Sequence, residues 1–182
     1  KWVHIRKSNT EPILRIISES ESINKSHQII DSIKELRINK LVLSIIKKGS
    51  ELELYIEKLA YGGLGIAHHE NIVVFVKGAI PEQTVRVKIY KKKKKYFEAY
   101  VIEKIKSSKF EISPKCTHFG ICGGCSFQNY NYVNQLSQKH DQVESMFQKL
   151  GGIKNVPIEP IIGCEKQYNY RNKMEFTYSP NK

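Results

Sequence analysis

Short apolar runs separated by turn residues begin with ELELYIEKLAYGGLGIAHHENIVVFVKGAIPE, residues 51–82. Similar runs continue to residue 102, and turn signals rich in glycine, asparagine and proline recur at intervals of about ten residues. Alternation of apolar and polar residues over so few positions predicts β-strands with one buried face. We therefore expect a mainly β fold with some α-helix, centred on a small five-stranded β-barrel over residues 51–108.

The glycines of Tyr61-Gly62-Gly63-Leu64-Gly65 admit two interpretations. A phosphate-cradling loop needs a helix that opens directly after it, whereas a strand-like run follows here. Glycines also allow the sharp bends at the corners of a barrel. We interpret Gly62, Gly63 and Gly65 as structural.

Five consecutive lysines lie between the fourth and fifth expected strands. A hairpin turn there would project them into solvent, which is typical of a mobile loop that contacts phosphates. The neighbouring rings of Tyr90, Tyr96 and Phe97 offer surfaces on which bases stack. The alternative is a solvated basic turn beside core aromatics. The candidate RNA-binding residues here are Lys91, Lys92, Lys93, Lys94 and Lys95.

Positive charge is spread along the whole chain. The 182 residues carry 30 Lys+Arg against 18 Asp+Glu, a formal net charge of +12, with a surplus in each of residues 1–50, 51–108 and 109–182. This distribution favours a polyanionic partner, nucleic acid first, over a single basic tail. A soluble protein of a lysine-rich proteome is the alternative. No stretch approaches the ~20 apolar residues that cross a bilayer, so we expect no membrane partner.

Three of the four cysteines occur in the run Cys116-Thr-His-Phe-Gly-Ile-Cys122-Gly-Gly-Cys125. Gly123 and Gly124 allow the tight turns that direct closely spaced thiols at one centre. Three thiolates leave a tetrahedral zinc or an iron–sulfur cubane one ligand short. The spacing therefore predicts metal ligation by Cys116, Cys122 and Cys125 with a fourth donor from elsewhere.

Clustered thiols in a chain without a recognisable secretory signal favour a reducing compartment. We expect a cytoplasmic, monomeric protein, with an organelle as the alternative if the source is eukaryotic. The chain starts at Lys1 and stops at Lys182 just after a strand-like run, so we interpret it as a piece of a longer protein.

Residues past the cysteines predict a helix over 131–150, ended by a left-handed cap at Gly151-Gly152. Its apolar face, expected to be core, comprises Leu136, Val143, Met146, Phe147 and Leu150. A strand-rich region is expected to start at residues 158–162. Arg171 and Lys173 lie two apart, on one face of an extended strand, and we expect both to contact RNA.

Residues 1–50 are the least informative part of the chain. Ile29, Ile30, Ile33 and Leu36 have helical spacing, which predicts one helix near residues 26–37 with Ser26 as its cap. The serine-rich, charged residues 18–26 are typical of a loop or disorder. We treat residues 1–50 as an unassigned, partly helical extension.

Four features in fixed order resemble the amino-terminal half of the bacterial-type RNA uracil-5-methyltransferases. They are the barrel with its Gly-Gly-x-Gly corner, the basic turn, the cysteine block followed by a helix, and Tyr170-Arg171-Asn172-Lys173. The resemblance covers residues 51–182, and the cysteine block is its most specific part.

The resemblance implies an OB-like TRAM domain that grips RNA over residues 51–108, and an iron–sulfur block, a helix and the start of an α+β central domain over 109–182. Cys116, Cys122 and Cys125 would be three of the four ligands of a [4Fe-4S] cluster, with the fourth beyond Lys182. In relatives the fourth ligand follows the Tyr170-Arg171-Asn172-Lys173 run, whereas Cys164 precedes it. We therefore expect Cys164 to be an ordinary small buried residue, with ligation of the cluster as the alternative. Phe127 is expected to cover the cluster.

In such enzymes a further, Rossmann-like domain binds S-adenosylmethionine. There a cysteine attacks carbon 6 of uracil, the methyl group passes to carbon 5, and a carboxylate base removes the carbon-5 proton. No catalytic or S-adenosylmethionine-binding residue is expected within this chain, so we expect it to be inactive alone. The cluster is expected to be structural, because this methyl transfer requires no electron.

The sequence thus indicates the RNA-binding, cluster-containing portion of an RNA uracil-5-methyltransferase, with 23S ribosomal RNA favoured as substrate over transfer RNA. The alternative from another class is a non-catalytic RNA-binding module. In it, Cys116, His118, Cys122 and Cys125 would bind zinc without help from outside the chain.

Overall fold

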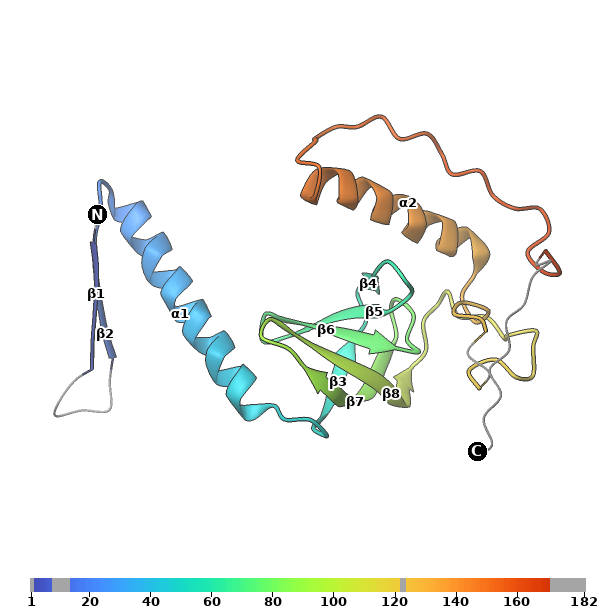
Figure 1. Cartoon of the computed structure of the whole chain (residues 1–182), viewed down its shortest axis with the longest axis horizontal. Helices are drawn as coiled ribbons and strands as arrows, with labels where there is room; N and C mark the ends of the chain where they lie inside the picture. Colours follow the sequence, from blue (N-terminus) through green and yellow to red (C-terminus); the bar gives the residue numbers. More distant parts are fainter. Residues whose placement is uncertain (1, 8–13, 122–123, 171–182) are drawn as a thin grey trace. The chain divides into compact units, whose positions relative to one another are not determined.

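The computed structural model describes residues 2–7, 14–121 and 124–170. The chain divides into two units, residues 1–131 and 132–182. The elements, labelled in Figure 1, are β1 (Trp2–Lys7), β2 (Leu14–Glu19), α1 (Ile23–Ile45), β3 (Glu51–Tyr55), β4 (Lys58–Leu59), β5 (Gly65–His69), β6 (Ile72–Lys77), β7 (Thr84–Lys92), β8 (Tyr96–Lys106) and α2 (Tyr132–Lys149). Neither α1 nor α2 is long and apolar enough to span a bilayer.

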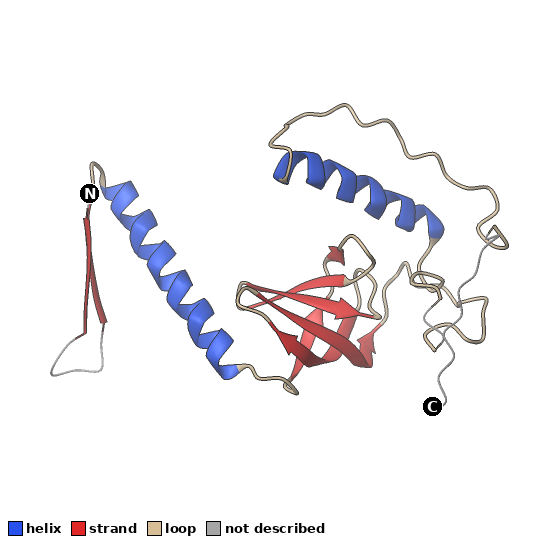
Figure 2. Ribbon diagram, viewed as in Figure 1, coloured by secondary structure: helices blue, strands red, loops and turns tan. Residues whose placement is uncertain are grey.

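A curled six-stranded sheet forms the centre of the first unit (Figure 2). Its strand order is β3-β7-β8-β6-β5-β4, in which β6 and β8 are parallel and the other neighbours are antiparallel. The sheet curls far enough for the Glu57 N–H, just after β3, to donate to the Ile66 carbonyl of β5 at 2.9 Å. The mainly β, barrel-like prediction is confirmed. The count of five strands missed β4, because two residues are too short to show alternation.

The core lies inside the curl and follows the predicted alternation. Alternate residues in the first part of β7, namely Val85, Val87 and Ile89, are at most 1% exposed. Phe97 and Ala99 of β8 complete the same layer with no exposed surface. Burying an aliphatic or aromatic side chain of this size contributes about 1.5–3 kcal/mol. This layer therefore fixes the register of the strands and sends the intervening residues outward.

The predicted turn at His69-Glu70-Asn71 is a two-residue hairpin between β5 and β6. Glu70 and Asn71 have φ values of 47° and 64°, and His69 pairs with Ile72. Two consecutive positive φ values match the right-handed twist of the flanking strands. Asparagine tolerates this conformation better than most residues, which explains why the turn could be predicted from the sequence.

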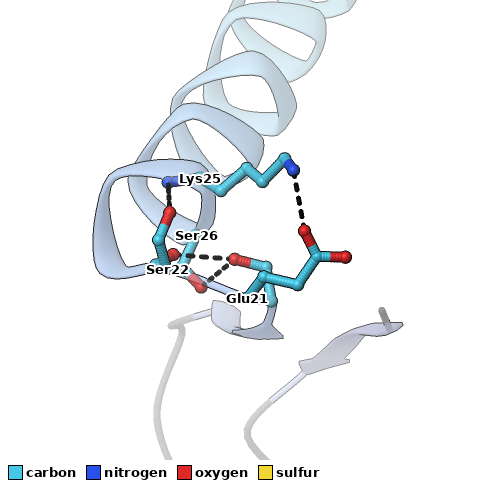
Figure 3. Close-up of polar contacts among 5 residues, drawn as sticks. Glu21, Ser22, Lys25 and Ser26 are labelled. Atoms are coloured by element: carbon cyan, nitrogen blue, oxygen red, sulfur yellow. Dashed lines mark hydrogen bonds and ion pairs between the residues drawn. The ribbon is translucent and has the colours of Figure 1, made fainter.

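Helix α1 begins earlier and ends later than the helix predicted near residues 26–37. Ser22, not Ser26, is its N-cap, and the Ser22 hydroxyl accepts from the Lys25 N–H at 3.3 Å. Figure 3 shows this contact beside the Lys25–Glu21 ion pair of 3.0 Å. Ser26 lies inside the first turn, where its hydroxyl lies 3.0 Å from that of Ser20. Residues 18–26, expected to be a loop, therefore end a strand and start a helix.

The last turn of α1 packs on the barrel. Ile46 is 6% exposed within the core, and Val42 and Leu43 pack against the same cluster. The Ile46 N–H donates to the Val42 carbonyl at 3.0 Å, which extends the helical pattern by one bond. Residues before Glu51 thus contribute to the barrel core.

The second unit contains α2, whose bounds confirm the helix predicted over 131–150. Its end also matches: Gly152 has φ 65°, and a β-carbon on Gly151 would lie 2.7 Å from the Phe147 carbonyl oxygen. The prediction that its apolar face is core is wrong, because none of its residues is buried. Residues 150–170 have no helix or strand, so the strand start expected at 158–162 is also wrong.

Candidate functional site

The cysteine loop, residues 113–128, is closed at its base by backbone pairing. The Ile112 N–H donates to the Asn129 carbonyl at 2.9 Å, and the Asn131 N–H donates to the Phe110 carbonyl at 3.0 Å. Between them, Glu111 and Tyr130 form an antiparallel bridge. The two ends of the loop are thus held together by the backbone, which limits the conformations open to the residues between them.

Aromatic residues at both ends of the cysteine loop pack onto the barrel. Tyr130, which is 2% exposed, forms a second apolar cluster with Leu59 and Ile80 of the barrel. Phe110 and Phe127 pack against this cluster. Phe127, expected to cover the metal cluster, therefore lies against the barrel.

A polar connection runs beside this apolar cluster. Gln83, which is 3% exposed, accepts from the Ile80 N–H at 3.0 Å and donates to Glu111 at 3.0 Å. The other oxygen of Glu111 accepts from Lys104 at 2.7 Å. Partial burial disfavours the charged carboxylate, but the hydrogen bonds from Lys104 and Gln83 outweigh it and hold the pKa of Glu111 below its ordinary value. Glu111 is thus an ionised residue that joins the base of the loop to the barrel.

Cys116 and Cys125 are both exposed, and neither forms a disulfide. The Gln128 side chain connects them, because its carbonyl oxygen accepts from the Cys116 N–H at 3.1 Å and its amide donates to Cys125 Sγ at 3.2 Å. An N–H donor on a sulfur favours the electron-rich thiolate that iron or zinc requires. Cys122, the third predicted ligand, lies outside the described residues.

Three members of the alternative zinc set lie in the described part of the chain, and they are not within ligation distance of one another as a group. Donors to one tetrahedral zinc lie about 3.8 Å apart, given Zn–S bonds near 2.3 Å. Cys116, His118 and Cys125 do not form a group of three donors within 4.8 Å of one another, and the group that does comprises His140, Asp141 and Glu144 on α2.

Cys164 is exposed, which corrects the expectation of a buried residue. Its N–H donates to the Tyr132 hydroxyl at 2.7 Å, and its thiol donates to the Lys166 carbonyl at 3.1 Å. These contacts fix Cys164 within the second unit.

Two residues of the lysine run, Lys91 and Lys92, form hydrogen bonds or ion pairs within the protein through their ammonium groups. Lys91 forms an ion pair of 3.1 Å with Glu98, which also accepts from the Tyr90 hydroxyl at 2.9 Å. The hydrogen bond from Lys91 lowers the pKa of Glu98 and raises that of Lys91. Partial burial and the bond to Glu98 raise the pKa of Tyr90. Lys91 is thus already engaged within the protein.

Lys92 connects the hairpin to α1. Its ammonium donates to the carbonyl of Leu43, and to that of Ile46 at 3.0 Å, so it caps the helix C-terminus. Residues 93–95 form the exposed turn, and their ammonium groups have no ion pair with any residue within the described ranges. Within the lysine run, the charge available to a ligand is therefore concentrated at Lys93, Lys94 and Lys95.

Only one of the three rings proposed for base stacking is open to a ligand. Phe97 has no exposed surface. Tyr96 is half-buried and packs edge-on against Phe75, with ring centroids 5.3 Å apart. Tyr90 is 37% exposed and lies beside Tyr100, which is 40% exposed. The other predicted RNA contacts, Arg171 and Lys173, lie outside the described residues.

Sequence reasoning did not identify Gln128 or Tyr100 as functional candidates. Gln128 follows Cys125 by three residues, close enough for its amide to reach back to the sulfur. Tyr100 carries a weaker signal, because only the alternation of β8 indicates that a large ring points outward.

Comparisons with known proteins agree with these features. Residues 47–102 match the TRAM domain. An uncharacterized RNA methyltransferase of Clostridium tetani is 43% identical over 135 residues, which are 73% of this chain and 29% of that protein. An uncharacterized RNA methyltransferase of Aquifex aeolicus is 38% identical over 135 residues, covering 74% of this chain and 32% of that protein. The chain thus spans less than a third of the length of these curated relatives.

Proposed function

We propose that this TRAM-containing chain is the RNA-binding, iron–sulfur-bearing amino-terminal portion of an S-adenosylmethionine-dependent RNA uracil-5-methyltransferase acting on 23S ribosomal RNA. The observation that carries the proposal is the 43% identity over 135 residues to a protein named an RNA methyltransferase. The TRAM domain over residues 47–102 supports RNA as the ligand. The described residues provide the binding part of this function, and we assign methyl transfer to the remaining length of the protein.

The donor set of the cysteine loop suits a [4Fe-4S] cluster. Cys116, Cys122 and Cys125 would supply three thiolates, and the amide of Gln128 adds an N–H donor to Cys125 Sγ. The backbone pairing at residues 110–112 and 129–131 holds the two ends of the loop together. When bound, the cluster would supply a cross-link between segments of the chain. We propose a structural role for it, because thiolate addition to uracil followed by methyl transfer moves no electron to or from a metal.

The exposed lysines support electrostatic attraction of RNA. Lys93, Lys94 and Lys95 add three positive charges at one turn, and a chain of net charge +12 attracts a polyanion over a longer range. Such contacts bind phosphates without reading sequence. The choice of target nucleotide would therefore depend on other contacts.

The test uses full-length protein, methyl-labelled S-adenosylmethionine and ribosomal RNA from cells that lack the protein. The expected product is 5-methyluridine, identified by mass spectrometry of the digested RNA. The 182-residue chain should bind the same RNA without transferring a methyl group. Methylation of another base, or of transfer RNA alone, would contradict the substrate assignment, and turnover by the short chain would contradict the placement of the active site.

A further inference from the structure

The outer face of β7 and β8 carries two tyrosines whose rings lie side by side. The centroids of Tyr90 and Tyr100 are 6.3 Å apart, and the ring planes differ by 33°. The exposed fractions are 37% and 40%, so one side of this pair is open to solvent. Such a pair adds little to the core, which is formed by the inward residues Ile89 and Ala99.

Two lysines flank Tyr100 on the neighbouring strands. In the backbone register, Lys88 of β7 and Lys77 of β6 are both direct partners of Tyr100. Direct partners in a sheet project their side chains to the same face. Strands lie about 4.8 Å apart, so the two lysine Cα atoms stand about 10 Å apart with the tyrosine between them.

The rings of this face are partly preorganised, and its cations are available to a ligand. Lys77 forms no ion pair with the residues that the structure describes, and Lys88 has only a long contact of 3.9 Å with Glu51. The Tyr90 hydroxyl is fixed by its 2.9 Å bond to Glu98, which restricts the ring next to Tyr100. A ligand would therefore find a cation on each side of an aromatic surface whose orientation is already restricted, which reduces the entropy that the rings lose on binding.

This combination matches the chemistry of unpaired nucleotides. Bases stack on aromatic rings, and lysines flanking the ring can contact the phosphates on either side. In a duplex the faces of the bases are covered by their neighbours, and recognition relies on shape and backbone instead. Tyrosine rings that only cover the sheet would need no flanking cations.

We propose that Tyr90, Tyr100, Lys77 and Lys88 form a stacking platform for single-stranded RNA on the outer face of the barrel. The inference rests on the proposed function in that it takes RNA as the ligand, and it adds that unpaired bases are recognised. The platform is distinct from the turn lysines 93–95, which supply charge alone.

The test measures binding of the 182-residue chain to three probes: an oligouridine of about 12 nucleotides, within the length that one OB-like fold covers, an RNA duplex of that length, and an abasic ribose-phosphate strand. We expect tight binding to the single strand only. Tyr100→Ala should weaken that binding roughly 5- to 100-fold and leave the salt dependence unchanged. Tyr100→Phe keeps the ring and should bind normally. Tyr61→Ala, at a turn tyrosine that is 83% exposed, serves as the control.

The failures of the two proposals are distinguishable. RNA binding that is equally strong for the abasic strand, or unaffected by Tyr100→Ala, would overturn the platform and leave the RNA-binding function in place. An absence of binding to ribosomal RNA and to every probe, by a folded protein, would overturn both. Far-ultraviolet circular dichroism of each variant establishes that it is folded.

Discussion

The ring of Phe127 lies against the Cα of Gly63, so that a β-carbon at this position would be 2.8 Å from Phe127 Cζ. Gly63 belongs to the Gly-Gly corner of the barrel, and Phe127 follows the last cysteine of the block by two residues. A glycine of the barrel corner is therefore in direct contact with a residue of the loop that carries the cysteines. The corner glycine is needed both for its φ of 89° and for the space that it leaves to the ring.

Replacing Gly63 by alanine should destabilise the protein by about 1–3 kcal/mol, because the substitution is strained at this φ and meets the Phe127 ring. Gly62→Ala is a matched control, since Gly62 has φ 87° but nothing within 4 Å of its added β-carbon. Chemical denaturation of both variants isolates the contact with Phe127. Equal destabilisation by the two changes would show that the ring does not press on Gly63.

Replacing Gln128 by leucine should weaken retention of the metal, because hydrogen bonds to a metal ligand are typically worth about 10- to 100-fold in metal affinity. Gln128→Glu separates the hydrogen bond to Cys116 from the one to Cys125. The carboxylate can accept from the Cys116 N–H but cannot donate to Cys125 Sγ. We expect both variants to lose the visible absorption of the cluster faster in air than the parent protein. Gln148→Leu, on α2, is the control, and identical decay in all four proteins would contradict a role for Gln128.

The lysine run should behave as two groups. Changing Lys93, Lys94 and Lys95 together to glutamine should make RNA binding less dependent on salt. The slope of log K against log salt concentration should become shallower by about 0.7 for each phosphate that is no longer neutralised. Changing Lys91 and Lys92 together to glutamine should reduce this slope less, because their ammonium groups already bind Glu98 and the carbonyl groups at the end of α1. The slope of binding against salt concentration measures this directly, and equal slopes for the triple and the double variant would refute the division.

Acid should loosen the base of the cysteine loop. The pKa of Glu111 is lowered in the folded protein, so its ionisation stabilises the fold above the ordinary value of 4.5, and that contribution is lost as the pH falls through the folded pKa. Glu111→Gln removes the ionisable group. We expect the difference in free energy of unfolding between parent and variant to be largest near neutral pH and to shrink below pH 4.5. A difference independent of pH would show that the carboxylate charge is not involved.

The barrel could be predicted from sequence, because the alternation of apolar and polar residues, the turn residues and the corner glycines all indicated the same strands. The cysteine spacing likewise indicated a metal site, although Cys122 lies outside the described residues. The contacts between the barrel and the cysteine loop could not be predicted from sequence. They are made by residues that come together only through folding and belong to no local pattern, namely Gln83, Glu111, Tyr130 and Phe127. The start of α1 was predicted too late, because Ser22 and Ser26 are equally good caps by residue type and the contacts of Figure 3 decide between them. Its end was predicted near residue 37 and lies at Ile45.

We propose that Cys116, Cys122 and Cys125 ligate an iron–sulfur cluster beside an RNA-binding barrel. The most direct test of this proposal is the iron, zinc and acid-labile sulfide content of full-length protein purified without oxygen, compared with a variant in which all three cysteines are serine. We predict about four irons and four sulfides per chain in the parent protein and neither in the variant. Stoichiometric zinc without sulfide, or iron and sulfide retained by the triple variant, would contradict the account.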